Sequence, residues 1–382
     1  MRVVMVVGRS TGGIGTHVAQ LSADLRDRGT DVIVVTHPLT AQRFDLGAMR
    51  LWWPGSAGWI RALHDFWLLR RLALDSDIVH AHGHQGGLLA ALSTMSIAPT
   101  RDRNRPKLSR PKLIVSQHNA VLEGSGRQGL KRLAQRWVAH RADLVTGASS
   151  DLVKEALLFG AGRAELAQVP SPRVPELLEQ RPPDAQMRAK TRATLFPSVN
   201  LLEVDLALPL VVTISRIAPQ KNLPVLVVAA SRLLSPCTWV VLGDGDPDLL
   251  TTLRAQAHAL GAPVHFVGAR SDAGQWLRAA EVFVLPSEWE ARALVVQEAM
   301  AAGTPVVATD VGGLHDLVAR AGLLVIPGDP DAIAEATERV LSDPGLRADL
   351  AQRGREVATN LPDGHDTATW WLERYAETLL MT

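Results

Sequence analysis

The sequence has very little cysteine and no long apolar run. Cys237 is the only cysteine among 382 residues, which excludes a disulfide framework and a zinc site built on cysteines. Such a composition favours the reducing cytoplasm as the compartment. The apolar run at residues 1–8 is too short for a secretory signal and predicts a buried first strand. No segment has the apolar length needed to span a bilayer, so we expect a cytoplasmic protein, peripheral to a membrane at most.

Two phosphate-binding motifs are incomplete in the turn that follows this first strand. A P-loop needs a lysine where Thr16 stands, and a dinucleotide-binding fingerprint needs a glycine where Val18 stands. The second gap disfavours a dehydrogenase. Gly13 and Gly15 can still present backbone amides and a helix N-terminus to a diphosphate. We interpret them as candidate diphosphate-binding residues, with a plain tight turn as the alternative.

The net charge of +1 hides an uneven distribution. Residues 1–170 carry 22 basic and 13 acidic side chains, whereas residues 171–382 carry 18 and 26. The basic half concentrates its charge in residues 101–112 and in Arg127, Lys131, Arg132, Arg136 and Arg141. Such a surface can attract an anionic membrane, a phosphorylated substrate or nucleic acid, and a solvated loop beside a charged helix face is the alternative. No aromatic residues alternate with the basic ones, as a single-strand binding platform needs, so we expect no nucleic acid partner.

Apolar runs alternate with helical patterns in two series, which predicts two α/β domains. The expected strands are residues 3–7, 31–36, 77–82, 113–118 and 142–147 in the first series, and 210–215, 238–243, 264–268, 282–285 and 305–308 in the second. The proline-rich residues 171–209 separate a first domain at 1–170 from a second at 210–364, and we interpret them as a linker. A final helix is expected at 365–382.

Two cations follow the first strand of the second series. Arg216 and Lys221 stand near the expected carboxyl end of that strand, where both can converge on one diphosphate. There they would offset the charge that develops on a leaving nucleoside diphosphate. The D-x-D sequence at residues 244–246 offers two carboxylates of the kind that can hold a divalent cation beside a diphosphate, but the two cations already supply positive charge here. We therefore interpret Gly243 and Gly245 as a turn near the nucleotide and expect no metal.

The segment at residues 286–313 carries two carboxylates near a short helix. Seven residues separate Glu290 from Glu298, and the intervening apolar residues lead into a helix ended by Gly303. A buried strand and a Gly-Gly turn follow. Carboxylates at the start of a helix and one or two turns along it can face the same crevice, which is where open α/β sheets bind their ligands.

These motifs resemble the signature of the retaining glycosyltransferases of family 4, which have the GT-B fold. The likeness covers nearly the whole chain and is weakest at residues 40–70 and 170–205. It implies two facing Rossmann-like domains with a cleft between them, and a C-terminal crossover helix that packs back on the N-terminal domain. It also implies that Glu290 contacts the donor sugar and that Glu298 hydrogen-bonds the nucleotide ribose. Leu294 would lie beside them on the donor side. The turn of Gly13 and Gly15 would approach the donor phosphates, as donor-binding residues, or the acceptor.

Three histidines stand at expected strand ends of the first domain. The resemblance implies that His118 lies beside the donor sugar and the reacting centre. For His80 and His82, contact with the acceptor and simple lining of the cleft remain open. Zinc binding by the three is a further alternative, but no i, i+4 pair or carboxylate ligand accompanies them.

The chain departs from the family pattern next to the first glutamate. Family members usually have Glu-Gly-Phe-Gly-Leu where this chain has Glu290-Ala-Arg-Ala-Leu294. Alanine disfavours backbone conformations that glycine permits. Arg292 replaces an aromatic residue and is an acceptor-side candidate, because its guanidinium can pair with a carboxylate or phosphate. A solvent-exposed arginine is the alternative.

The resemblance thus predicts an enzyme, a retaining glycosyltransferase that moves a sugar from a nucleoside diphosphate sugar, such as a UDP-sugar or GDP-mannose, to a hydroxyl acceptor. His118, Arg216, Lys221 and Glu290 are the candidate catalytic residues. Lipid-linked or cell-envelope glycan precursors are candidate acceptors, and the anionic inner face of the membrane is a candidate docking surface. We expect no cofactor. A sugar-nucleotide epimerase of the same fold and a catalytically inactive sugar-nucleotide-binding protein are the alternatives.

Overall fold

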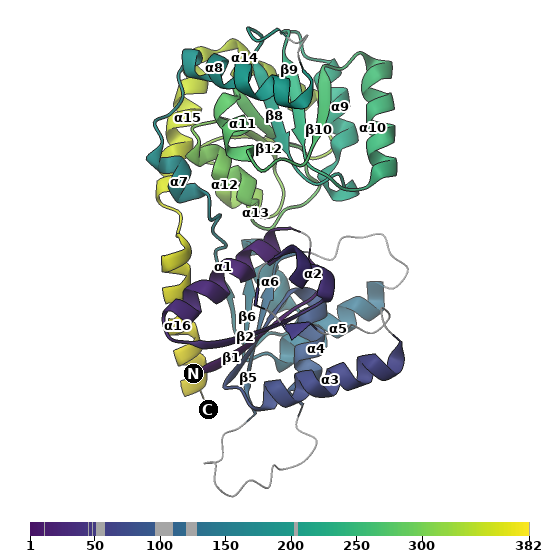
Figure 1. Cartoon of the computed structure of the whole chain (residues 1–382), viewed down its shortest axis with the longest axis vertical. Helices are drawn as coiled ribbons and strands as arrows, with labels where there is room; N and C mark the ends of the chain where they lie inside the picture. The colour runs from purple at the N-terminus through teal and green to yellow at the C-terminus, as the bar shows by residue number, and fades with distance from the viewer. Residues whose placement is uncertain are drawn as a thin grey trace, which may run out of the picture. The chain divides into compact units, whose positions relative to one another are not determined.

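The chain folds into two compact units, which Figure 1 shows with their elements labelled. A computed structural model describes residues 1–10, 12–44, 46–47, 49–50, 58–95, 110–119, 128–201 and 205–381. The first domain is Met1–Val169 together with Gly364–Thr382, and the second domain is Pro170–Asp363. Within the described ranges, no helix combines the length and the apolar character needed to cross a membrane.

The described part of the first domain contains a parallel sheet of seven strands in the order β3-β2-β1-β4-β5-β6-β7. The strands are β1 (Arg2–Val7), β2 (Asp31–Thr36), β3 (Met49–Arg50), β4 (Ile78–His82), β5 (Lys112–Gln117), β6 (Leu144–Gly147) and β7 (Ala164–Leu166). The central strands are apolar and buried on both faces, as a sheet covered by helices on two sides requires. The strand order reverses beside β1, so ligands are expected outside the carboxyl ends of β1 and β4.

Helices cover both faces of this first sheet. They are α1 (Gly13–Asp27), α2 (Pro38–Arg43), α3 (Trp59–Leu74), α4 (Gly83–Ser93), α5 (Gln128–Arg141), α6 (Ser150–Leu158) and α16 (Gly364–Leu380). One core cluster joins the sheet to α3, α4 and α5. A second cluster joins the sheet to α1 and α16.

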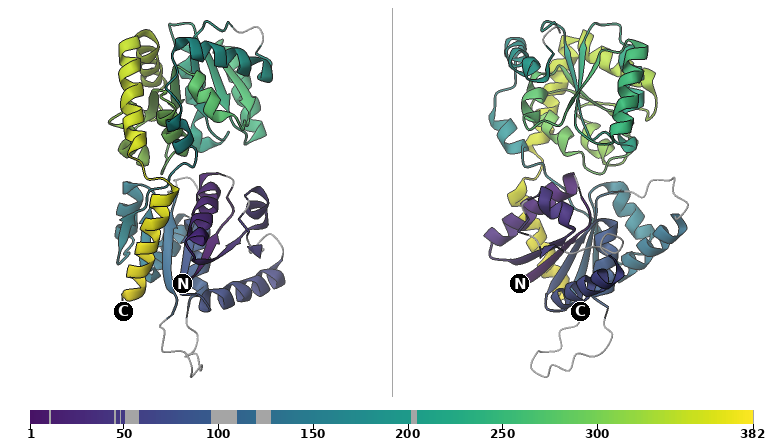
Figure 2. Two further views of the ribbon diagram at one scale, coloured as in Figure 1. Left: turned by 60° about the vertical axis from the view of Figure 1, so that its left-hand side comes forward. Right: turned by 45° about the vertical axis from the view of Figure 1, so that its right-hand side comes forward.

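The C-terminal helix α16 completes the core of the first domain. Ala368, Trp371 and Tyr375 are buried in the same cluster as Val3 and Met5 of β1. Figure 2 shows α16, the yellow helix that ends at the C-terminus, alongside the first-domain sheet. The predicted C-terminal helix and its packing on the N-terminal domain are therefore confirmed.

The described part of the second domain contains a parallel sheet of six strands in the order β10-β9-β8-β11-β12-β13. The strands are β8 (Leu210–Ile214), β9 (Thr238–Leu242), β10 (Val264–Gly268), β11 (Val282–Leu285), β12 (Val306–Thr309) and β13 (Leu323–Val325). Here the order reverses beside β8. The strands expected from the two sequence series are confirmed within two residues at each end. The short strands β3, β7 and β13 were not predicted, because two or three residues give no readable periodicity.

Helices again lie on both faces of the second sheet. They are α7 (Val174–Glu179), α8 (Ala185–Leu195), α9 (Leu223–Ser231), α10 (Pro247–Leu260), α11 (Ala273–Ala279), α12 (Leu294–Ala301), α13 (Gly313–Val318), α14 (Pro330–Ser342) and α15 (Pro344–Thr359), with 3-10 turns η1 (Phe196–Val199) and η2 (Pro219–Lys221). One core cluster includes residues of α7, α11 and α12, and the other includes residues of α9 and α14.

The interpretation of residues 171–209 as a linker is wrong. They belong to the second domain and contain α7, α8 and η1, and Phe196 is buried with its ring stacked 6.0 Å from that of Trp276. Pro175 and Pro197 stand in the first turns of α7 and η1. A proline is tolerated there because the missing N–H would have no partner within the helix. These two prolines therefore stand at helix starts and do not indicate a linker.

Candidate active site

Glu290 lies in the loop after β11 and is held by contacts within that loop and with two neighbouring loops. The carboxylate Oε1 accepts a hydrogen bond from the Ser287 hydroxyl (2.7 Å) and forms an ion pair with Lys221 Nζ. The Gly313 amide donates to the Glu290 carbonyl oxygen (2.8 Å). A Cβ atom at Gly312 would collide with that same oxygen, and Gly312 has a φ of 49°, so only glycine fits. Glu290 is 8% exposed, which makes these contacts necessary compensation for its lost hydration.

Glu298 lies in the second turn of α12 and is 7% exposed. Its Oε1 accepts a hydrogen bond from the Ser171 hydroxyl (2.6 Å), and Arg173 Nη1 lies 3.5 Å from its Oε2. The Ser171 amide in turn donates to the Gln297 side-chain oxygen (3.1 Å). Burial raises the pKa of Glu298, while the Ser171 hydroxyl and the charge of Arg173 act in the opposite direction. The carboxylate predicted to bind ribose is thus in contact with donor groups of Ser171 and Arg173, which lie at the start of the second domain.

The two predicted diphosphate-binding cations differ in their surroundings. Lys221 ends η2, its side chain is 14% exposed, and its charge is paired with Glu290. Asn222 follows in the left-handed conformation (φ 48°) and separates η2 from α9. Arg216 is exposed and forms no ion pair with any residue of the described ranges. One cation is therefore held at the carboxylate, and the other projects from the same loop.

Gly243 and Gly245 lie in a turn against the loop that carries Arg216. A Cβ atom on either glycine would collide with a backbone oxygen of that loop, so these glycines permit the close backbone approach. The carboxylates of the D-x-D sequence also serve the turn. Asp244 accepts a hydrogen bond from the Ala269 amide (3.0 Å), and Asp246 accepts two from the first amides of α10. The structure therefore gives both aspartates local backbone partners.

The alanines that replace the family's glycines create no backbone strain. Neither Ala291 nor Ala293 has a positive φ, and Ala293 caps α12 at φ −72°, ψ 99°, a region open to any residue. Arg292, between them, is half-buried. Burial lowers the pKa of its guanidinium, and Asp316 of α13 opposes that shift. Leu294 is half-buried at the start of α12.

A cluster of buried histidines lies at the carboxyl ends of β4 and β5. His82 Nδ1 lies 3.1 Å from His118 Nε2, and the two rings are stacked with centroids 5.4 Å apart. His17 of α1 lies against both rings, at 5.9 and 5.6 Å. Burial lowers the pKa of His17 to about 4 and that of His118 to about 3. These imidazoles are therefore neutral at pH 7.

The structure assigns His80 to the core of the first domain. It is fully buried, with Nδ1 2.7 Å from the Tyr375 hydroxyl and Nε2 2.7 Å from the Ser116 hydroxyl. Both ring nitrogens are occupied, so His80 cannot contact an acceptor as the sequence suggested. Its partner on α16 explains the burial, because the histidine ties the C-terminal helix to the sheet.

The glycines after β1 serve different purposes. The Gly15 amide is already bonded to the Gly12 carbonyl (2.9 Å) and the Ser10 hydroxyl (3.1 Å). A Cβ atom at Gly15 would collide with the ring of Phe44. Gly15 is therefore required for packing, which corrects its interpretation as a donor-binding residue. Gly13 is exposed as the first residue of α1 and stays a candidate.

Two sequence families match the chain, one on each domain. The family described as "Glycosyl transferase 4-like domain" matches residues 12–172, and "Glycosyl transferases group 1" matches residues 208–343. A D-inositol 3-phosphate glycosyltransferase from Xylanimonas cellulosilytica is 30% identical over an alignment of 404 residues, covering 96% of this chain and 92% of the relative. The chain belongs to the group 1 glycosyltransferases.

Further proteins resemble this glycosyltransferase along most of its length. A D-inositol 3-phosphate glycosyltransferase from Jonesia denitrificans is 33% identical, over 79% of this chain and 72% of the relative. The crystal structure of Anabaena Alr3699/HepE in complex with UDP superposes with a TM-score of 0.79 at 19% identity, covering 99% of this chain and all of that one. The same protein was also solved with UDP-glucose. The predicted fold, GT-B with two Rossmann-like domains, is confirmed.

Four side chains described above at the candidate site were not predicted, those of Ser171, Arg173, Ser287 and His17. Ser171 lies in the segment interpreted as a linker, and its contact with Glu298 spans 127 residues, so no local pattern marks it. Ser287 precedes Glu290 by three residues, but no pattern marked its hydroxyl as a partner of the carboxylate. His17 stands two residues after Gly15, near the start of the helix that follows the glycine turn, and its burial could not be read from the sequence.

The histidine cluster of this glycosyltransferase makes its stability depend on pH. The folded-state pKa values lie below the unfolded value of about 6.5, so unfolding takes up protons as the pH falls. The contribution is complete above pH 6.5 and is lost as the pH falls toward the folded-state pKa, which is about 4 for His17 and about 3 for His118. We expect the free energy of unfolding to fall by about 1 kcal/mol per pH unit for each buried histidine between pH 6.5 and 5, as measured by urea denaturation.

The variant His118→Asn removes one of these protons and should make the decline with pH shallower by that amount. His258→Asn, at an exposed position of the second domain, is the matched control and should leave the slope unchanged. A slope that is the same in His118→Asn and in the parent would contradict the assignment.

Proposed function

We propose that this glycosyltransferase transfers a sugar from a nucleoside diphosphate sugar held by the second domain to a hydroxyl acceptor held by the first, with retention of configuration. The observation that carries the proposal is the Lys221–Glu290 ion pair with Arg216 beside it, at the carboxyl ends of β8 and β11. The strand order reverses between these strands, and open α/β sheets bind ligands at such a point.

The similar proteins support the substrate class. The HepE structures contain UDP and UDP-glucose, so a UDP-sugar is the first donor to try, ahead of GDP-mannose. The names of the full-length relatives point to a phosphorylated inositol as an acceptor, and a lipid-linked glycan precursor is the second class. The test is a thermal-shift screen of UDP-, GDP- and ADP-sugars, followed by NMR of the product's anomeric configuration. Release of an epimerised sugar nucleotide without transfer would contradict the proposal.

In this proposal the charge of each side chain determines its role. Arg216 and Lys221 offset the negative charge that grows on the departing diphosphate, and no metal ion is assigned. Lys221 reaches this role when the diphosphate competes with Glu290 for its ammonium group. Glu290 accepts hydrogen bonds from hydroxyls of the donor sugar, and Glu298 accepts them from the ribose. The low pKa of His118 makes it a poor base at pH 7, so we assign it a hydrogen bond to the sugar instead of proton abstraction.

Glu298→Ala should weaken UDP binding without unfolding the protein. A hydrogen bond to a charged carboxylate contributes about 1.5–3 kcal/mol, which is roughly a tenfold to hundredfold change in affinity. Calorimetry with UDP measures it. The matched control is Glu288→Ala, an exposed glutamate of the loop after β11, which should bind UDP like the parent. Unchanged affinity in Glu298→Ala would remove the ribose role.

Arg216→Ala should lower kcat by about 10²–10³, because the charge it offsets develops in the transition state. The KM for the acceptor should change little. Arg320→Ala, an exposed arginine of the same domain, is the control for general charge effects. Activity should also persist in EDTA. Loss of activity in the chelator with recovery on adding manganese or magnesium would restore a metal role to the D-x-D sequence.

A membrane-docking surface is the second part of the proposal. Helices α3 and α5 both contact α4 and carry exposed apolar side chains: Trp59, Ile60, Leu63 and Trp67 on α3, and Leu130 and Leu133 on α5. Exposed basic residues lie beside them: Arg61, Arg71, Lys131, Arg132 and Arg136. Apolar and aromatic residues among basic ones are typical of helices that lie in the surface of an anionic bilayer. Residues 101–109 and Arg127 of the predicted basic surface lie outside the described residues.

Vesicle flotation should therefore recover the protein with anionic lipid at low salt and recover much less at high salt, because each basic residue near the surface contributes about 1 kcal/mol. The double variant Trp59→Ser, Trp67→Ser should bind several-fold more weakly, since it removes apolar area that enters the interface. Leu234→Ser, at a residue of the second domain that is 89% exposed, is the control. Equal recovery with neutral and anionic vesicles at low salt would contradict the surface.

A further inference from the structure

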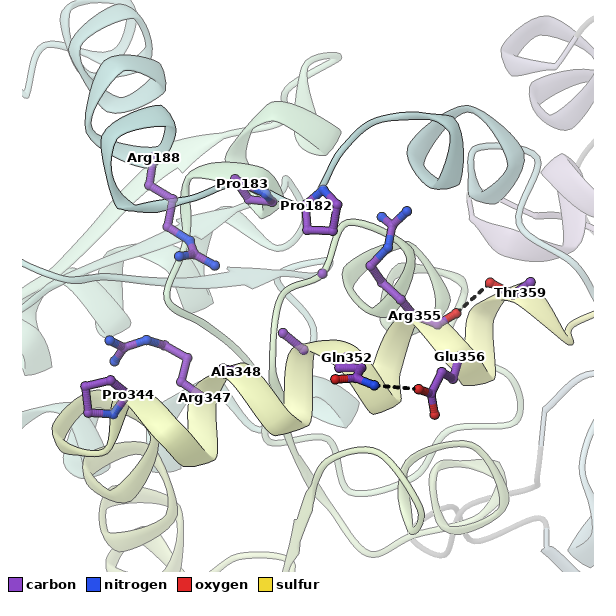
Figure 3. A pocket seen from close by; sticks show the side chains of 12 residues that line it. Pro182, Pro183, Arg188, Pro344, Arg347, Ala348, Gln352, Arg355, Glu356 and Thr359 are labelled. Atoms are coloured by element: carbon purple, nitrogen blue, oxygen red, sulfur yellow. Dashed lines mark hydrogen bonds between the residues drawn. The ribbon is translucent and has the colours of Figure 1, made fainter.

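The second domain has a pocket whose lining shares no residue with the candidate active site. Its volume is about 580 Å³, within the range of small-molecule sites. It lies between α15, the start of α8 and the chain that joins α7 to α8, as Figure 3 shows. The residues that matter here are Pro182, Pro183, Arg188, Arg347, Gln352 and Arg355.

Three arginines line this pocket, and none forms an ion pair with a carboxylate of the described residues. Backbone carbonyls hold them in place instead. Arg188 Nε donates to the Ala280 carbonyl (3.2 Å), Arg347 Nη1 donates to two carbonyls near the end of α14 (3.0 and 3.1 Å), and Arg355 Nη1 donates to the Ala301 carbonyl (2.6 Å). Carbonyl oxygens orient a guanidinium but leave its full charge uncompensated.

Arg188 experiences this excess of positive charge most directly. Burial lowers the pKa of its guanidinium, and the neighbouring Arg347 and Arg192 lower it further. Glu281 and Asp184 oppose the shift, but Glu281 is engaged by both terminal nitrogens of Arg192 (3.1 and 3.3 Å). A half-buried cation with two other cations nearby, whose strongest anionic neighbour Glu281 is already bonded by Arg192, gains free energy when an anion binds.

The pocket has two chemically different ends. In Figure 3 the guanidinium groups of Arg188 and Arg347 lie at one end, whereas Gln352 and Glu356 lie at the other, joined by a hydrogen bond of 2.9 Å. Proline and alanine side chains form much of the wall between them. The first end suits a dianion that accepts N–H bonds from two guanidiniums, and the second end suits neutral hydroxyl groups.

We propose that this pocket binds a phosphate monoester of a small polyol or sugar. The phosphate contacts Arg188 and Arg347, and the hydroxyls of the organic part contact Gln352 and Glu356. A neutral polyol lacks the charge that the arginine end requires, and inorganic phosphate lacks the hydroxyls. The site is separate from donor binding, because Arg216, Lys221, Glu290 and Glu298 do not line it.

The test is calorimetric titration of the full-length protein, saturated with UDP, with glycerol phosphate, inorganic phosphate and glycerol. Glycerol phosphate should bind saturably, inorganic phosphate more weakly, and glycerol not at all. Arg188→Gln should weaken glycerol phosphate binding by about tenfold to a hundredfold, because it removes charge-assisted hydrogen bonds. Arg353→Gln replaces an exposed arginine of α15 that does not line the pocket and should bind like the parent.

A second variant distinguishes a loss of ligand binding from a loss of the folded structure. Ala348→Glu changes an exposed lining residue of α15 to another good helix former, so it adds a carboxylate beside the arginines without removing a hydrogen bond. It should weaken binding as Arg188→Gln does while leaving UDP affinity unchanged. Absence of saturable binding to the parent, or equal weakening in Arg353→Gln, would overturn the proposal. So would binding lost in Arg216→Ala but kept in Arg188→Gln, since the ligand would then occupy the donor site.

Discussion

In each domain, the placement of the candidate site residues depends on one constraint, the reversal of strand order in the parallel sheet. β1 lies between β2 and β4, and β8 lies between β9 and β11. At each reversal, the connections that leave the two neighbouring strands pass to opposite faces of the sheet, which opens a crevice at the carboxyl ends of those strands. In the second domain, the loops after β8 and β11 bring Lys221 onto Glu290 although 69 residues separate them. In the first domain, the turn after β1 starts the helix whose His17 meets the histidines after β4 and β5. In both domains, strand order brings together site side chains that are far apart in the sequence.

Burial of two carboxylates is the second constraint. A charged group removed from water must find donors within the protein. The second domain supplies an ammonium and a hydroxyl to Glu290, and a hydroxyl and a guanidinium to Glu298. In the proposed function, the same two carboxylates accept hydrogen bonds from hydroxyl groups of the donor sugar and the ribose. The protein therefore holds both glutamates in place before substrate arrives, which limits the reorganisation that binding requires.

Much of this architecture could be predicted from the sequence, because apolar runs, glycine turns and the Glu290–Glu298 spacing are local signals. What could not be predicted are contacts between distant residues. His80 gave the same signal as His82, and its bonds to Ser116 and to Tyr375, which is 295 residues away, distinguish it. Gly15 looked like a phosphate turn, but Phe44 decides its role. The prolines between 171 and 209 suggested a linker. A proline is compatible with the first turn of a helix, but the sequence did not show where α7 and η1 start.

The first domain is discontinuous in sequence, and this governs the order in which the protein can form. Its core includes Ala368, Trp371 and Tyr375, yet the chain leaves this domain at Val169 and returns at Gly364. During synthesis, the intervening residues take roughly 10–40 s to emerge at 5–20 residues per second. Throughout that interval His80 lacks the tyrosine that occupies its Nδ1, and one face of the sheet lacks a covering helix. The second domain is continuous and meets no such delay, so the domain that begins the chain is the last to be completed.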